Sequence, residues 1–139
     1  MLSLLFAALS AVTVHAPKAD LQLDVARSAA EREYGLMNRT SLAPHTGMIF
    51  VFAQDAPVQF WMKNTLIPLD MVWVGSDGTV RQVDANVPVV PPKLPDDQIP
   101  LESGVGQFVI ELRAGEAAAD GIEIGTKLNL VNVPAALPN

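Results

Sequence analysis

Residues 60–74 read FWMKNTLIPLDMVWV, an apolar run interrupted by the polar group Lys63-Asn64-Thr65 and by one carboxylate, Asp70. A run this apolar predicts a segment that is buried on both faces or that passes between two packed layers. Polar groups inside it need partners, because leaving a buried neutral polar group unpaired costs roughly 2–7 kcal/mol. The polar residues therefore form either a turn that reaches the surface or the lining of a site.

The chain starts with a different kind of segment, MLSLLFAALSAVTVHA. Its apolar stretch, from Leu2 to about Val14, is shorter than the roughly 18–20 residues that a membrane-spanning helix needs. Val14 and Ala16 suit the positions that a signal peptidase reads, although no Lys or Arg precedes the apolar stretch. We expect residues 1–16 to be a cleaved signal peptide, which predicts a periplasmic or secreted protein with no stable membrane insertion; an uncleaved anchor is the alternative.

Residues 17–139 are expected to form one domain, because they are enough to bury a core and contain no internal repeat. The chain has nine Lys and Arg against fifteen Asp and Glu, a net charge of −6. An acidic domain without a basic stretch is a poor partner for nucleic acid or an anionic membrane. The absence of cysteine excludes disulfides, thiol catalysis and a lipid-modified N-terminal cysteine.

Strand patterns dominate this domain. Residues 21–25 alternate between apolar and polar side chains, as strands with one buried face do. Residues 107–113 alternate in the same way, and the two sets of side chains must therefore point to opposite faces of a sheet. One set is Phe108, Ile110 and Leu112, and the other is Val109, Glu111 and Arg113. Further strands are expected at 48–52, 71–74, 80–83 and 128–133, with turns at 55–57 and 75–78.

Two short helices and one long loop complete the expected domain. Ser28 and Glu31 have the spacing of a capping box, which predicts a helix of about ten residues that ends near Asn38. Gly35 costs about 1 kcal/mol inside a helix and indicates close packing or an earlier end. A second helical turn is expected at 117–120. Residues 88–100 contain five prolines and are expected to be an extended loop, either a rim of a site or a surface excursion.

The candidate ligand-binding residues are those of the opening segment: Trp61, Lys63, Asn64, Thr65 and Asp70. A few polar groups in an apolar, aromatic wall are typical of a small-molecule site. Asp70 and Glu111 are the carboxylates within strongly apolar strands, so they could also form an acid/base pair if they meet. The alternative is that each pairs with a cation such as Lys63, Arg39 or Arg113. Arg39 and Arg113 are thus expected to be structural or to support the site, as Glu111 does.

Metal and cofactor chemistry has little support in the sequence. His45 is the one histidine after residue 16, and its Pro/Gly turn favours an exposed residue without a role. Met37, Met48, Met62 and Met71 could bind Cu(I) as soft ligands, but each lies in an apolar segment where methionine ordinarily fills the core. We therefore expect no metal and no cofactor.

Three strings identify a family resemblance: GLMNRTSLAPHTGMIFVF at 35–52, FWMKNTLIPLDMVWV at 60–74 and FVIELRAGEAAADGIEIGTKL at 108–128. Together they resemble the family known as domain of unknown function 192, over about residues 21–131. The departures are small: Arg113 stands where Asn often precedes Ala-Gly, and Thr126 where Asp is common. The resemblance implies a compact, mainly β domain, often exported. It implies no known activity, so no catalytic residue is carried over.

The expected fold is a single mainly β (β-rich α+β) domain, a β-sandwich or distorted barrel of about seven strands with one or two short helices. The expected function is a ligand-binding or accessory module for a small molecule or envelope component, with a pocket around the WMKNT-LIPLD segment. One alternative is a cell-envelope hydrolase that uses Asp70 and Glu111. The other is a structural or protein-interaction module in which the same polar residues only stabilise a bent hairpin.

Overall fold

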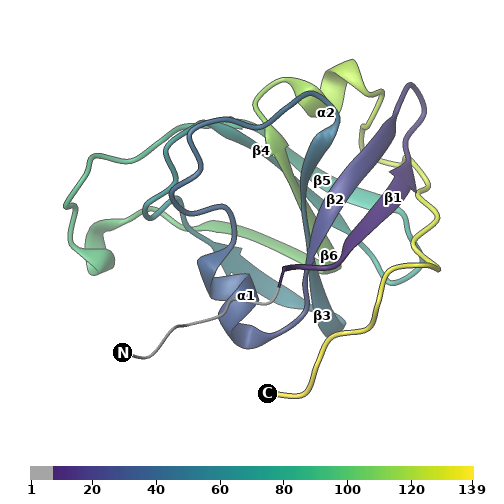
Figure 1. Cartoon of the computed structure of the whole chain (residues 1–139), viewed down its shortest axis with the longest axis horizontal. Helices are drawn as coiled ribbons and strands as arrows, with labels where there is room; N and C mark the ends of the chain where they lie inside the picture. Colours follow the sequence, from purple (N-terminus) through teal and green to yellow (C-terminus); the bar gives the residue numbers. More distant parts are fainter. Residues whose placement is uncertain (1–7) are drawn as a thin grey trace.

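A single mixed sheet organises the chain (Figure 1). The structure is a computed structural model that describes residues 8–139, and in these residues six strands pair in the order β1-β2-β3-β6-β4-β5. The β2–β3 pair is parallel and the other pairs are antiparallel. The elements are β1 (Ala11–His15), β2 (Asp20–Ala26), α1 (Ala29–Tyr34), β3 (Thr46–Phe60), β4 (Leu69–Val74), β5 (Val80–Val87), the 3₁₀ helix η1 (Asp96–Gln98), β6 (Glu102–Arg113) and α2 (Glu116–Ala119). The prediction of a mainly β domain with short helices is confirmed.

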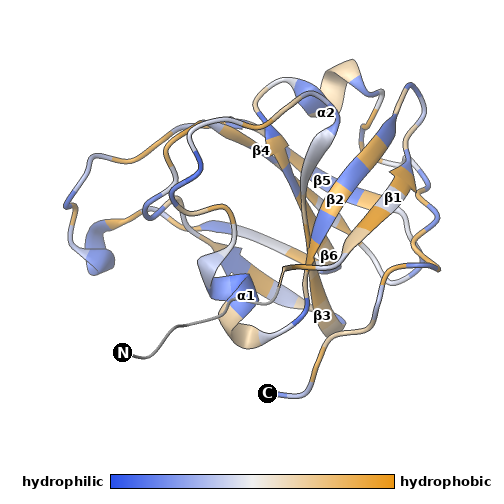
Figure 2. Cartoon of the chain, viewed as in Figure 1, coloured by the Kyte–Doolittle hydropathy of each residue, from blue (hydrophilic) through white to orange (hydrophobic). Residues whose placement is uncertain are grey.

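Both faces of the sheet are covered, so the central strands are apolar on both sides. In β6, Phe108, Ile110 and Leu112 enter one core cluster and Val109 enters the other. The first cluster includes Ala117 of α2 and residues of the C-terminal segment, and the second includes Leu36 after α1 and residues of the 61–68 turn. The predicted division of residues 107–113 between two faces is confirmed. Figure 2 shows the alternation most clearly in β2, where blue and orange positions follow each other.

The N-terminal helix starts as predicted and ends earlier. The Ser28 hydroxyl accepts a hydrogen bond from the Glu31 amide, and the Glu31 carboxylate accepts from the Ser28 amide. The helix stops at Tyr34, because Gly35 takes a positive φ of 50° and lies against the Phe50 ring, where a Cβ would come within 3.1 Å. Gly35 is therefore a helix end that also allows close packing on β3.

Residues 11–15 belong to the sheet. They form β1, pair with β2, and place Val14 in the core with 1% of its surface exposed. The part of the predicted signal peptide that covers residues 1–7 lies outside the described residues. Cleavage after Ala16 stays a prediction, and it would remove β1, whose apolar composition resembles that of a leader.

Other boundaries also differ from the sequence prediction. The expected turn at 55–57 is part of β3, which continues through a register shift between Val51 and Ala56. The expected strand at 128–133 is instead an irregular segment with one isolated bridge, Thr79 to Lys127, beside it. Residues 88–100 form the predicted loop, in which η1 is the one regular element. Over residues 8–139, no helix has the length and apolar character to cross a membrane.

Candidate functional site

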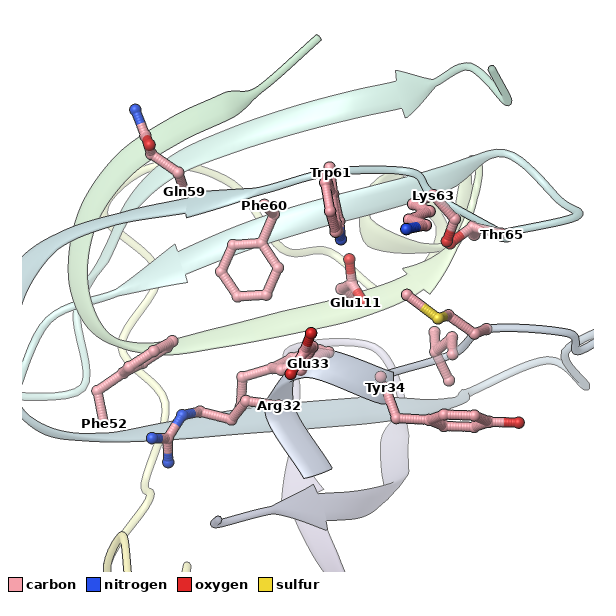
Figure 3. A pocket seen from close by; sticks show the side chains of 14 residues that line it. Arg32, Glu33, Tyr34, Phe52, Gln59, Phe60, Trp61, Lys63, Thr65 and Glu111 are labelled. Atoms are coloured by element: carbon pink, nitrogen blue, oxygen red, sulfur yellow. The ribbon is translucent and has the colours of Figure 1, made fainter. Parts of the chain in front are cut away.

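A cavity of about 270 Å³ lies between α1 and the end of β3, on the α1 side of the sheet. The loop after α1 and the 61–65 turn close it from two sides, and the Asn38 amide donates to the Asn64 carbonyl at 2.8 Å to join those two segments. Its floor is β6 and the adjoining part of β3. The residues that define its chemistry are Arg32, Glu33, Phe50, Phe52, Phe60, Trp61, Lys63, Thr65 and Glu111 (Figure 3).

Glu111 is the polar group at the floor of this cavity. It lies in β6 between β3 and β4, and only 4% of its surface is exposed. Its carboxyl forms no hydrogen bond or ion pair with any other group of residues 8–139. Burial without a compensating cation raises the pKa of this carboxyl from 4.5 to about 8. At neutral pH Glu111 is therefore mostly a neutral acid, with an O–H donor and a carbonyl acceptor that face the cavity.

Aromatic rings build the wall around this acid. Phe60 meets Phe50 edge to face at 4.9 Å between ring centroids, and it meets Phe52 in the same way at 6.2 Å. Trp61 continues the wall, and Figure 3 shows its indole above Glu111 with the ring nitrogen at the near end. Edge-to-face contacts hold rings in definite orientations. The cavity is thus a preformed hollow with one polar group at its floor.

Two basic side chains lie at the edge of the cavity, and both already have partners. Lys63 lies over the Trp61 ring, 5.1 Å from its centroid, and its ammonium forms an ion pair with Asp96 at 2.9 Å. Arg32 lies over the Phe52 ring at 5.2 Å and donates to the carbonyls of Arg27 and Val51. Neither cation neutralises Glu111.

The structure separates the five predicted ligand-binding residues into three groups. Trp61, Lys63 and Thr65 line the cavity together. Asn64 has a positive φ of 53° and shapes the turn. It lines only a second hollow, of about 440 Å³, between the turn and the proline-rich loop, which Lys63 and Thr65 also line. Asp70 lines neither hollow.

Asp70 has a structural role on the opposite side of the sheet. Its carboxylate accepts hydrogen bonds from the amides of Gly115 and Ala117 at the start of α2, at 3.0 and 2.9 Å. It also accepts from the Asn86 amide of β5 at 2.9 Å. With 1% of its surface exposed and three donors in place, Asp70 fastens α2 and β5 to β4. Lys63 does not pair with it, because Lys63 binds Asp96.

The proposed pairing of Asp70 with Glu111 is wrong. Leu112 lies opposite Asp70 across the β4–β6 ladder, and Met71 lies opposite Glu111. Opposed residues share a face and neighbours along a strand alternate, so the two carboxyls point to different faces. A hydrolase mechanism that uses these two residues as an acid/base pair is therefore excluded. The expected pairing of each with Lys63, Arg39 or Arg113 is also wrong.

The two arginines that were expected to be structural form ion pairs near the surface. Arg39 Nη2 lies 3.0 Å from Asp24 Oδ2, and more than a third of each side chain is exposed (37% and 35%). Arg113 Nε lies 3.0 Å from Glu116 Oε1, which is almost completely buried. Arg39 thus belongs to a surface ion pair, and Arg113 balances a buried carboxylate.

His45 has more partners than its turn suggested. Its Nδ1 lies 2.7 Å from Asp120 Oδ1 and 3.4 Å from Glu116 Oε2, and its amide donates to Glu116 at 2.9 Å. The three side chains offer ligand atoms within 4.8 Å of one another, which is the spacing of a possible metal site. Arg113 already balances Glu116, while burial and the hydrogen bond with Glu116 raise the pKa of Asp120. The contacts of His45 with Glu116 and Asp120 fasten the turn before β3 to α2.

Sequence reasoning did not find the α1 side of the cavity. Arg32 and Glu33 belong to a helix that was predicted from its capping box alone, which carries no signal of a site. Phe52 ends a predicted strand, and Phe60 is the first residue of the apolar run at 60–74. Only the packing of α1 beside the end of β3 brings them to Glu111. The sequence signals that did point to the cavity were Glu111, a carboxylate within an apolar strand, and the polar group at 63–65.

Comparison with known families and structures gives a context for this site. The family model DUF192, described as an uncharacterised ACR, matches residues 11–130. The chain belongs to this family. A DUF192 model that begins at residue 11 also includes β1. The search among curated proteins found no match.

Two crystal structures resemble this DUF192 chain. One is a protein from Sinorhizobium meliloti 1021 whose suggested role is that of a transcription regulator; it is 33% identical, with a TM-score of 0.77 over 88% of this chain and 95% of that one. The other is a protein of unknown function from Novosphingobium aromaticivorans DSM 12444; it is 32% identical, with a TM-score of 0.72 over 93% of this chain and 90% of that one. Both resemblances cover most of the sheet-dominated fold.

Proposed function

We propose that this DUF192 domain is a binding module for a small organic molecule, which it holds in the cavity above Glu111. The observation that carries the proposal is a carboxyl buried to 4% exposure that has no partner within residues 8–139 and that lines a hollow. A polar group buried without a partner costs stability, so the presence of Glu111 on a central strand calls for a compensating role. A ligand that pairs with Glu111 supplies that role.

The surroundings of Glu111 support binding over a purely structural role. Asp70 has all its donors within the fold, as a structural carboxylate should. Within residues 8–139 Glu111 has none, and it faces aromatic rings that give a ligand apolar contact. An apolar pocket with a few convergent polar groups and a perturbed pKa is the usual form of a small-molecule site.

The role of transcription regulator suggested for the Sinorhizobium meliloti protein is not carried over to this chain, because direct binding to nucleic acid has no support in its charge. The chain carries six more acidic than basic residues. Binding to phosphate backbones depends on clustered Lys and Arg. The basic residues at the cavity, Lys63 and Arg32, are already engaged by Asp96 and by backbone carbonyls.

Export is a separate proposal that rests on the apolar segment from Leu2 to Val14. A periplasmic or secreted domain would meet small envelope components, which fits a binding module. Intact-mass measurement of the protein recovered from its source cells would test the processing step: a mass that starts at Pro17 supports cleavage, and a mass that retains residues 11–16 contradicts it.

A fragment screen by ¹H–¹⁵N NMR would test the binding proposal. Fragments that bind should shift the amide signals of Trp61, Lys63 and Thr65. Glu33→Trp should block the cavity mouth and abolish those shifts, because Glu33 is an exposed residue of its lining. Glu123→Trp, at an exposed glutamate outside the lining, is the matched control and should keep them.

Two results would contradict the proposal. One is a screen in which no fragment perturbs the lining residues of the folded wild-type protein. The other is a set of shifts that persists unchanged in Glu33→Trp, since binding would then lie elsewhere.

A further inference from the structure

We infer that the ligand of this cavity carries a positively charged amine, which forms an ion pair with Glu111. The inference rests on the proposed binding function and names the chemical class of the ligand. Three features of the cavity carry it: the unpartnered carboxyl, the engagement of the nearby cations, and the aromatic wall.

First, the buried carboxyl of Glu111 has no cation beside it in the described part of the chain. A carboxyl in an apolar site can exist as a neutral acid or as an anion paired with a cation. Burial is the cause of the raised pKa of Glu111, and no cation of residues 8–139 offsets it. A cation placed in the cavity beside Glu111 would supply the missing interaction.

The second step is that the protein does not supply this cation itself. The other titratable groups that line the cavity are Arg32, Glu33 and Tyr34 from α1 and its end, and Lys63 from the turn. Arg32 donates to two backbone carbonyls and to Asn139, and Lys63 is held by Asp96. Glu33 is exposed at the mouth, so it adds a negative charge on the path to Glu111.

The third step concerns the wall. Aromatic faces attract cations through their quadrupole, and the attraction increases when the cation is desolvated. Two rings of this cavity already hold a cation each: Trp61 holds Lys63 and Phe52 holds Arg32. The chain's net charge of −6 also favours the approach of a cationic ligand over an anionic one.

Binding of an ammonium group is then coupled to loss of a proton from Glu111. Below the pKa of about 8, the apparent affinity should rise about tenfold for each pH unit, because the competent ionised form becomes about tenfold more populated. A neutral ligand that accepts a hydrogen bond would show the opposite pH dependence. It needs the protonated carboxyl of Glu111 as donor, so its affinity would fall above pH 8.

Three probes of similar shape would test this inference by NMR titration: benzylammonium, benzyl alcohol and benzoate. We expect benzylammonium to bind at the cavity, with an affinity that rises from pH 6 to pH 8. In Glu111→Gln its affinity should fall at least tenfold. Glu123→Gln makes the same chemical change at an exposed site and should bind it as wild type does. The wild-type pH series keeps the test valid even if Glu111→Gln folds poorly.

The outcomes separate the class of ligand from the function. Binding of benzyl alcohol or benzoate at the cavity, with no binding of benzylammonium, would overturn the amine inference and leave the binding function intact. An affinity for benzylammonium that does not change with pH or with Glu111→Gln would also overturn it. If none of the probes binds, the inference fails, and the fragment screen then decides the proposed function by itself.

Discussion

Glu111→Gln should make the stability of the protein much less dependent on pH. In the unfolded chain the carboxyl should titrate near its ordinary pKa of 4.5, whereas burial raises the folded value to about 8. Between these values the folded state binds a proton that the unfolded state has lost, so stability falls as pH rises. Glutamine has a similar shape and no proton to lose.

The size of the effect follows from the two pKa values. Each pH unit between them costs about 1.4 kcal/mol, so the wild-type protein should lose roughly 4 kcal/mol from pH 5 to pH 9 through this group alone. At pH 5 Glu111→Gln and wild type should therefore be within about 1 kcal/mol of each other. At pH 9 the variant should be more stable by about 4 kcal/mol.

Urea denaturation followed by circular dichroism at pH 5, 7 and 9 would measure these differences. Glu123→Gln removes one exposed carboxyl and should follow wild type at each pH. Other titrating groups affect all three proteins alike, so the difference between curves isolates Glu111. Parallel curves for Glu111→Gln and wild type would refute the reasoning, because they would mean that Glu111 titrates normally in the fold.

Three further predictions concern the stability of the fold that carries the cavity. Asp70→Ala should cost at least about 3 kcal/mol of stability, because three backbone amides lose their acceptor. Lys63→Ala should change stability by less than about 1 kcal/mol. Thermal melts of the double mutant should show additive losses, and coupled losses would contradict the separate roles of Asp70 and Lys63. Ser28→Ala should destabilise by about 1 kcal/mol through loss of the α1 cap, measured by urea melts, and an unchanged midpoint would contradict a stabilising cap. A chain that starts at Pro17 should be at least about 2 kcal/mol less stable than one that starts at Ala8, because it lacks β1 and the buried Val14. Equal midpoints in urea denaturation would show that β1 does not contribute to stability.

The local pattern of the sequence was sufficient to predict the central strands of the sheet and the start of α1. Alternation in residues 107–113 depends only on the geometry of a strand, so it assigned Glu111 to the correct face without knowledge of the fold. The capping box likewise involves residues three apart. Features with such short sequence separation can be read from the chain directly.

The composition of the cavity could not be read in this way, because its parts come from distant segments. Glu111 meets α1 only through the order of strands in the sheet, and Asp70 finds its donors at Gly115 and Ala117, more than forty residues later. The single polar group Lys63-Asn64-Thr65 indicated the right neighbourhood. The position of Asp70 in the sequence, only five residues after Thr65, did not reveal that its side chain points to the opposite face of the sheet.

The N-terminal strand shows a different limit. An apolar segment near the start of a chain satisfies both the pattern of a signal peptide and that of an edge strand. The structure adds that residues 11–15 pair with β2 and bury Val14 in the folded chain, and that cleavage after Ala16 would remove this strand.

A site-resolved ¹³C NMR titration of the Glu111 carboxyl carbon tests the central claim most directly. In the free protein it should show a midpoint near pH 8, caused by burial without a cation. Saturating benzylammonium should move this midpoint to lower pH, because the bound cation stabilises the carboxylate. A midpoint near 4.5 in the free protein would contradict the proposal that Glu111 binds a ligand, since Glu111 would then be an ordinary solvated carboxylate.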